Sequence, residues 1–237
     1  MIKRILFVSL LLYLILFTNA IAQEKGKEKI PKRINVDNVE EDSLGLNIIN
    51  EFNVYRNVIY LNSIVQYNTK DLWSFGLQLL NIPLRNNGAQ NYEYDGYLTL
   101  TKSIKLSEND VLSIGTQVGT TLLSQPPTQI HNFSFVDNQY EVNDTFNFHI
   151  AAFYVNDALA TIHQPFGIIA GFEYKVFPKK FHIQGDWYSG NSNVSGSVVN
   201  FNYYVLDNFQ CYIGINVPAH NSGNEFAGNL GFNLRLK

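Results

Sequence analysis

The chain has 237 residues, with 17 lysines and arginines against 20 aspartates and glutamates, and a net charge of −3 at pH 7. This balance excludes a general nucleic-acid-binding protein, because there is no basic stripe to neutralise phosphates. The single cysteine, Cys211, excludes an intramolecular disulfide and a cysteine-based metal site. Aromatic residues make up 14% of the chain and charged residues only 16%, which is less charge than a soluble secreted protein usually carries.

The first 22 residues have the pattern of a cleaved secretory signal peptide. Lys3 and Arg4 precede a continuous apolar run over residues 5–17, and small residues follow at both positions that a signal peptidase reads. An uncleaved membrane anchor is the alternative, but the apolar run is short for a spanning helix. Cleavage before Gln23 is therefore predicted.

Residues 23–43 mix both signs of charge without any periodicity. This composition favours a flexible N-terminal segment. A plug folded into the body of the protein is the second interpretation.

From residue 44 the sequence has the pattern of strands separated by turns, with no helical period and no internal repeat. In residues 144–155, for example, Phe146, Phe148 and Ile150 alternate with polar residues, and a period of two is typical of a strand with two different faces. The predicted strands are 44–54, 58–67, 72–82, 94–105, 111–122, 144–155, 158–163, 166–177, 180–189, 194–205, 209–217 and 226–236.

Connection lengths alternate along the chain. Short turns are predicted at 68–71, 107–110, 156–157, 177–180 and 206–208, and the connections between them are longer, above all 124–143. This alternation favours an antiparallel up-and-down barrel with its short turns at one end. Twelve strands are predicted, and ten is the alternative because 158–163 is short and poorly patterned.

In the last predicted strand, 226–236, apolar residues alternate with small, polar or basic residues more strictly than in the other strands. Phe226, Gly228, Leu230, Phe232, Leu234 and Leu236 fall on one face, and small, polar or basic residues fall on the other. About eleven residues is the length that a tilted strand needs to cross a bilayer. After residue 22 no apolar run approaches helical spanning length, so a membrane form must be a closed barrel.

This strand resembles the closing strand of bacterial outer-membrane β-barrels, except that the chain ends in Leu236-Lys237 rather than on an aromatic residue. The resemblance implies that residues 44–237 form an all-β transmembrane barrel in the outer membrane, in contact with its lipid. It also implies that barrel-assembly machinery reads the last strand and that residues 23–43 lie in the periplasm. A large soluble β-sandwich is the alternative, but aromatic residues cluster near the predicted strand ends, where interfacial girdles lie.

If the apolar face of each strand meets lipid, the polar face lines the interior. The charged or strongly polar residues expected there are Glu51, Gln66, Gln78, Glu173, Lys175, His182, Asp186, Asn200, Asn202 and Arg235. Two interpretations of this set stay open. It forms a charged constriction that sorts solutes, or a salt-bridged interior that only holds a narrow barrel together.

No enzymatic function is expected. Outer-membrane phospholipase A resembles this chain in strand number and uses a serine and a histidine two residues apart on one strand. No histidine on a predicted strand here has a serine at that distance, and a nucleophile needs its base within hydrogen-bond reach. The five histidines have no metal-ligand spacing, so neither a metal nor a cofactor is predicted.

The sequence therefore predicts a porin-like barrel through which small polar solutes diffuse. The alternative is a non-conducting structural or surface-binding barrel that acts through its extracellular loops. The predicted loop 124–143, with Pro126-Pro127 and Phe133-Ser-Phe135, is then the contact surface, and whether it folds inward separates the two functions.

Overall fold

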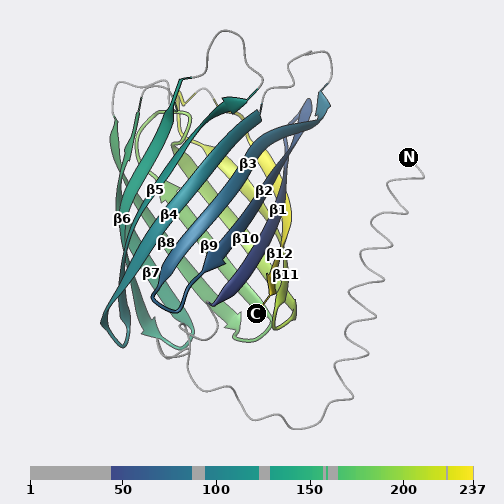
Figure 1. Cartoon of the computed structure of the whole chain (residues 1–237). Coiled ribbons are helices and arrows are strands. Elements are labelled where there is room, and N and C mark those ends of the chain that lie inside the picture. Colours follow the sequence, from purple (N-terminus) through teal and green to yellow (C-terminus); the bar gives the residue numbers. More distant parts are fainter. Residues whose placement is uncertain are drawn as a thin grey trace, which may run out of the picture. The chain divides into compact units, whose positions relative to one another are not determined.

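The structure is a computed structural model that describes residues 44–86, 94–122, 129–156, 159, 165–222 and 224–236. The predicted signal peptide and the segment 23–43 lie outside these ranges. The described residues form twelve antiparallel strands that close into a barrel (Figure 1). Within the same ranges there is no helix long and apolar enough to cross a membrane.

Each strand pairs with its neighbours in sequence, and β1 pairs with β12 to close the sheet. The closing register runs from Leu46 opposite Leu236 to Val54 opposite Gly228. The strands are β1 (Gly45–Val54), β2 (Val58–Asn68), β3 (Trp73–Asn86), β4 (Tyr94–Ser107), β5 (Asp110–Leu122), β6 (His131–Asn143), β7 (Phe146–Val155), β8 (Phe166–Phe177), β9 (Phe181–Tyr188), β10 (Gly196–Leu206), β11 (Phe209–Pro218) and β12 (Ala227–Leu236). The prediction of a twelve-strand barrel is confirmed, and both the ten-strand barrel and the sandwich are wrong.

One strand lies where the sequence predicted a loop. Residues 131–143, within the predicted loop 124–143, form β6, which pairs with β5 and β7. Its outer face carries Asn132, Ser134 and Asn138, whereas Phe133 and Phe135 lie on its inner face. Residues 132–135 thus reverse the apolar-outside pattern, whereas Val136, Tyr140 and Val142 farther along the strand are exposed on the outside as usual. Because the pattern changes within the strand, β6 was not predicted.

The predicted strand 158–163 is not part of the barrel, because β7 pairs directly with β8. Leu159 is in a turn, and the other residues of that segment lie outside the described ranges. The strand count of twelve was therefore correct although one strand was missed and another was wrongly predicted.

The two ends of the barrel differ in their connections. The connections 69–72, 108–109, 144–145, 178–180 and 207–208 all lie at one end, here called the short-turn end, where the chain also enters β1 and leaves β12 (Figure 1). The opposite end is called the long-loop end. The predicted short turn 156–157 follows β7 and lies at the long-loop end, because the missed strand β6 reverses the direction of β7.

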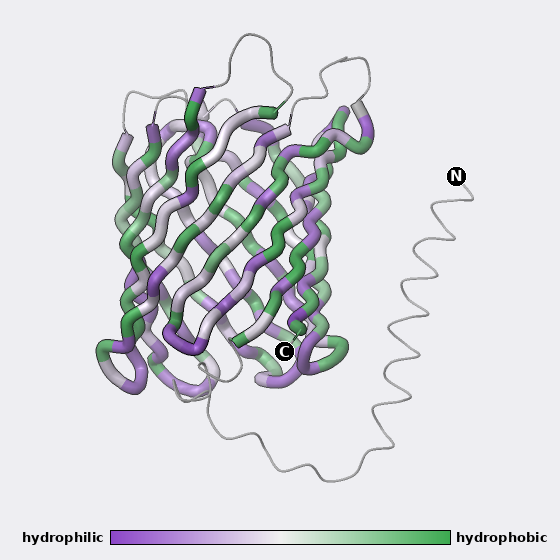
Figure 2. Tube along the Cα trace, viewed as in Figure 1, coloured by the Kyte–Doolittle hydropathy of each residue, from purple (hydrophilic) through white to green (hydrophobic). Residues whose placement is uncertain are grey.

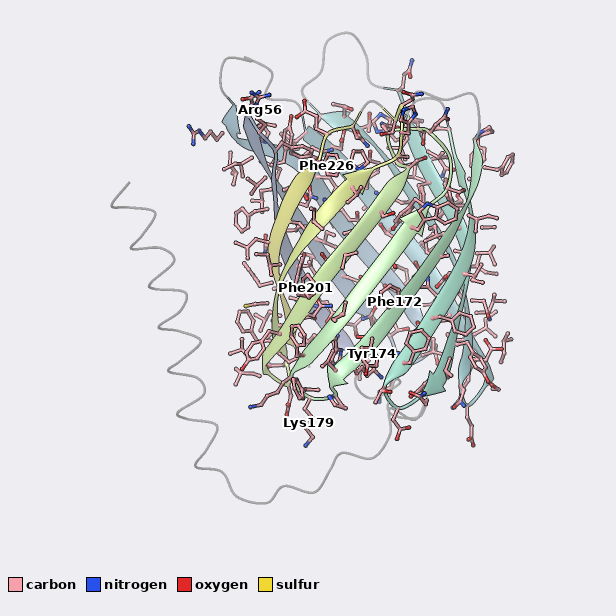
Figure 3. The ribbon with its side chains drawn as sticks, turned by 180° about the vertical axis from the view of Figure 1, so that it is seen from behind. Arg56, Phe172, Tyr174, Lys179, Phe201 and Phe226 are labelled. Atoms are coloured by element: carbon pink, nitrogen blue, oxygen red, sulfur yellow. The ribbon has the colours of Figure 1, made fainter. Side chains whose placement is uncertain are left out.

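Large apolar side chains cover the outside of the barrel. Leu98, Ile213 and Ile168 are 68%, 60% and 52% exposed, and apolar and polar residues alternate along the strands (Figure 2). Phe172 and Phe201 are also exposed, on strands that face the viewer in Figure 3. Such a surface is stable in lipid and not in water.

Trp73 and Lys102 form an outward-facing pair near the short-turn end. The ammonium of Lys102 lies 5.2 Å from the centre of the Trp73 ring and also donates a hydrogen bond to the carbonyl of Asp71. Tryptophan and a lysine that extends toward water are typical of the boundary between hydrocarbon and headgroups. The pair therefore marks the edge of the apolar belt at this end.

Candidate functional site

A polar cavity of about 520 Å³ lies inside the barrel at the short-turn end. Five of the ten residues predicted to face the interior line it: Gln66, Gln78, Glu173, Lys175 and Arg235. Most of the other lining side chains carry amide or hydroxyl groups. The cavity is thus lined mainly by groups that form hydrogen bonds to solutes or water.

The other five predicted residues (Glu51, His182, Asp186, Asn200 and Asn202) are not among the residues that line this cavity. Each forms a hydrogen bond to another side chain on the inner face. Asn202 forms the longest of these bonds, 3.5 Å from its Nδ2 to Oε1 of Gln184. These five residues therefore brace the wall.

A series of asparagines crosses the closing seam between β1 and β12. Asn229 donates to Asn200 at 2.9 Å and to Asn216 at 3.4 Å, and Asn216 donates to Asn53 at 3.1 Å. Asn53 in turn donates to the carboxylate of Glu51 at 2.9 Å. The network joins β10, β11, β12 and β1 through side-chain hydrogen bonds on the inner face. Bonds in such a network strengthen one another.

Glu173 and His182 form a hydrogen-bonded pair across the β8–β9 hairpin. Oε1 of Glu173 lies 2.7 Å from Nδ1 of His182, and Nε2 of that ring donates to the carbonyl of Pro178 at 2.9 Å. Asp186, on the same strand as His182, bonds to a residue of β7.

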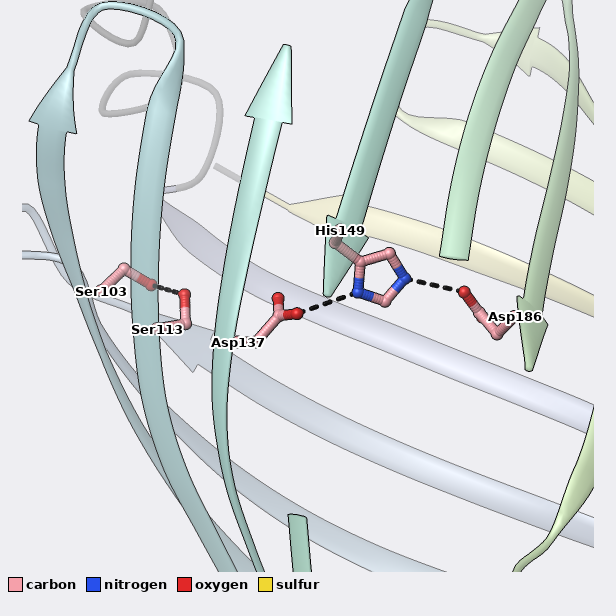
Figure 4. Close-up of polar contacts among 5 residues, drawn as sticks. All are labelled: Ser103, Ser113, Asp137, His149 and Asp186. Carbon is pink, nitrogen blue, oxygen red and sulfur yellow. Dashed lines mark hydrogen bonds and ion pairs between the residues drawn. The ribbon is translucent and has the colours of Figure 1, made fainter. Parts of the chain in front are cut away.

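A histidine bridges two carboxylates across the inner face of β6 to β9. His149 on β7 lies 2.9 Å from Asp137 on β6 and 2.8 Å from Asp186 on β9 (Figure 4). An ionised carboxylate only accepts hydrogen bonds, so with both acids ionised each ring nitrogen donates. The three groups then carry a single net negative charge on this part of the wall.

The ring of His149 reaches Asp186 by passing over β8 at Gly171, which is opposite both residues. A Cβ atom on Gly171 would lie 2.0 Å from Nε2 of His149 and 2.1 Å from Oδ1 of Asp186. No side chain fits there, so glycine is required for the bridge. Tyr212 makes a similar crossing over Gly231 to reach Glu51, with an O–O distance of 3.1 Å.

Apolar side chains cover part of the inner wall at the long-loop end. Phe153 stacks on Phe133 with ring centres 5.4 Å apart and contacts Tyr188. Leu159 and Val194, from the connections that follow β7 and β9, pack against the same cluster. Phe133 and Phe135, which the alternative function placed in an external contact loop, thus face the interior.

No strand in the described ranges carries a serine two residues from a histidine. Ser222 lies two residues after His220, but both are in the turn after β11 and not on a strand. His131 forms a hydrogen bond to the hydroxyl of Tyr97 at 2.8 Å. Within the described ranges no group of three or more histidine, cysteine or acidic side chains is placed to hold a metal ion.

No protein-family model and no curated protein matches the sequence. Among solved structures, the fold is similar to the KdgM porin, with a TM-score of 0.61 and 7% identity over 81% of this chain and 99% of that chain. The NanC porin has a TM-score of 0.57 and 13% identity with the same coverage. An active-site mutant of outer membrane phospholipase A from Escherichia coli has a TM-score of 0.52 and 9% identity, over 90% of this chain and 95% of that chain.

These likenesses show the fold. The barrel is of the outer-membrane type that the closing strand predicted, and together with the apolar belt it points to the bacterial outer membrane. In such barrels the short turns face the periplasm. Porins and a phospholipase share this fold, so function has to be argued from the interior.

Proposed function

We propose that this chain is a porin-like, non-enzymatic channel through which small polar solutes diffuse across the outer membrane. The observation that carries the proposal is the cavity of about 520 Å³ inside the barrel, lined by amide, hydroxyl and charged side chains. Such groups replace part of the water around a polar solute, which lowers the desolvation free energy that the solute incurs on entering the barrel. The likeness to the KdgM and NanC porins supports the same function.

The charges of the interior disfavour polyanionic solutes. Glu51, Asp137 and Asp186 belong to the wall, and Glu173 lines the cavity beside Lys175. The KdgM porin has been solved with oligogalacturonate, an oligomer of an acidic sugar. A wall with this many carboxylates repels such a chain, so we do not propose an acidic oligosaccharide as the solute.

Single-channel recording in a planar bilayer tests the proposal on the refolded mature chain, with a heat-dependent gel shift as the check that the barrel has formed. We expect discrete conductance steps. The change Glu173→Gln should lower the cation-to-anion permeability ratio about fivefold, which corresponds to about 1 kcal/mol for one charge in a wet lumen. The matched control is Glu225→Gln, which removes an exposed carboxylate from the β11–β12 connection and should leave the ratio unchanged.

The alternative function is a non-conducting barrel that binds partners through its extracellular loops. The apolar cluster of Phe153 and the packing of Leu159 and Val194 against it favour this alternative, because they fill part of the interior. A folded barrel without conductance would overturn the channel and leave the loops as the functional surface. In both cases we propose that the partners include outer-membrane lipid and the barrel-assembly machinery, which reads β12.

A further inference from the structure

Two buried residues that line the cavity at the short-turn end, Lys175 and Asn147, each have a polar group without a hydrogen bond to the described residues. Lys175 is only 4% exposed and lines the cavity, and its ammonium forms no hydrogen bond or ion pair within the part of the chain that the structure describes. Asn147 is 8% exposed and lines the same cavity, and its carbonyl oxygen Oδ1 likewise has no partner there. The unpaired oxygen of Asn147 is fully buried, which is costly. The ammonium of Lys175 is not fully shielded, so it is accessible from the cavity.

The acid two positions before Lys175 does not supply a direct partner for it. Glu173 precedes it by two residues on the same face of β8, and the two charges interact electrostatically. However, Oε1 of Glu173 is 2.7 Å from His182, and Oε2 accepts a hydrogen bond from Nδ2 of Asn147 at 3.1 Å. Each carboxylate oxygen thus bonds to another side chain and neither bonds to Lys175, so the ammonium remains available to an anion in the cavity.

The two groups lie close enough for one small molecule to contact both. Asn147 is directly opposite Glu173 in the register of β7 and β8, and Lys175 follows two residues later, about 7 Å along the strand. Lysine binds anions as a point charge, and an amide oxygen accepts a hydrogen bond. The matching molecule presents a carboxylate to Lys175 and an O–H or N–H donor to Asn147.

We infer that this cavity binds a small hydroxy acid or amino acid, held by its carboxylate at Lys175 and by its hydroxyl or amino group at Asn147. A solute with one carboxylate fits better than a polyanion, because Glu173 and Glu141 line the same cavity. The inference refines the proposed channel function by naming a solute class, but binding itself does not require conduction.

Isothermal titration calorimetry on the refolded full barrel in detergent tests the inference with three probes. Glycolate carries a carboxylate and a hydroxyl, acetate carries only the carboxylate, and ethylene glycol carries only hydroxyls. We expect glycolate to bind tightest, acetate more weakly and ethylene glycol not measurably. The change Lys175→Met should weaken glycolate binding at least about tenfold, since a hydrogen bond to a charged group is lost.

The matched control is Lys179→Met, which removes the same charge from the exposed β8–β9 turn (Figure 3) and should leave glycolate binding unchanged. Asn147→Leu should bring the glycolate-to-acetate affinity ratio toward one. If Lys175→Met fails the heat-dependent gel shift, Lys175→Gln provides the same test with a polar side chain.

Unchanged glycolate binding in the folded Lys175 variants would overturn the inference, as would equal affinities of the parent barrel for glycolate and acetate. Conductance without saturable glycolate binding would overturn this inference and leave the channel intact. Glycolate binding to a barrel that does not conduct would overturn the channel and support the site.

Discussion

Replacing His149 with alanine should destabilise the folded barrel by about 3 kcal/mol, because two hydrogen bonds to charged groups are lost and each contributes about 1.5–3 kcal/mol. The lower end of the summed range applies, since the side chains of His149, Asp137 and Asp186 are 26%, 22% and 15% exposed and water partly replaces the ring. Equilibrium unfolding in denaturant, with the barrel in lipid vesicles, measures the loss. His220→Ala, which changes an exposed histidine in the turn after β11, is the control and should have no measurable effect.

The same replacement tests the charge of the wall. Without the ring between them, Asp137 and Asp186 face the lumen as two negative charges, so the cation-to-anion permeability ratio of the channel should rise. Adding Asp137→Asn and Asp186→Asn to His149→Ala should return the ratio to the parent value or below it, because the carboxylates are then removed as well. If His149→Ala destabilises the barrel no more than His220→Ala does, the bridge contributes nothing to stability.

Alternation within single strands was enough to predict much of the interior. It placed Gln66, Gln78, Glu173, Lys175 and Arg235 on inner faces, and all five line one cavity. Alternation depends only on the direction of successive side chains in one strand, so it needs no knowledge of neighbouring strands. The closing strand was recognisable for the same reason.

The bridge of His149 could not be predicted in this way. Its partners lie on β6 and β9, and the choice of partner depends on the register of strands that are not adjacent in sequence. The position of His149 on the polar face of its strand was visible, but Asp137 lay in the segment predicted as a loop. Such a bridge can be identified by a glycine on the intervening strand that lies opposite both bridged residues. This glycine can be recognised only when the register of the strands is known.

The missed strand β6 shows where binary patterning fails. An outward face with Asn132 and Ser134 is costly in lipid unless its polar groups are paired. Here both bond to each other and to Thr116 of β5, at distances from 2.9 to 3.2 Å. The inward Phe133 is buried by Phe153 and by the connections at the long-loop end. At residues 132–135 local pairing thus replaces the usual pattern, and alternation alone does not predict it.

The closing strand contains two glycines for which the same mutation should have opposite effects. Gly231 on β12 faces inward, and a Cβ atom there would lie 2.4 Å from the ring and hydroxyl of Tyr212 and 2.7 Å from the carbonyl oxygen of Asn50. Gly231→Ala should therefore destabilise the barrel by about 3 kcal/mol, at the upper end for overpacking, because the hydrogen bond from Tyr212 to Glu51 is displaced as well.

Gly228→Ala, three residues earlier on the same strand, is the matched control. An added Cβ atom there meets no other atom within 4 Å, so alanine restricts only the unfolded chain and should stabilise the barrel by about 0.5 kcal/mol. Equilibrium unfolding of both variants in vesicles measures the difference. Equal effects would show that Tyr212 does not cross β12 as described, and the seam between β1 and β12 would then be held by its backbone pairing and the asparagine network alone. A large loss confined to Gly231→Ala would establish the crossing as part of what closes the barrel.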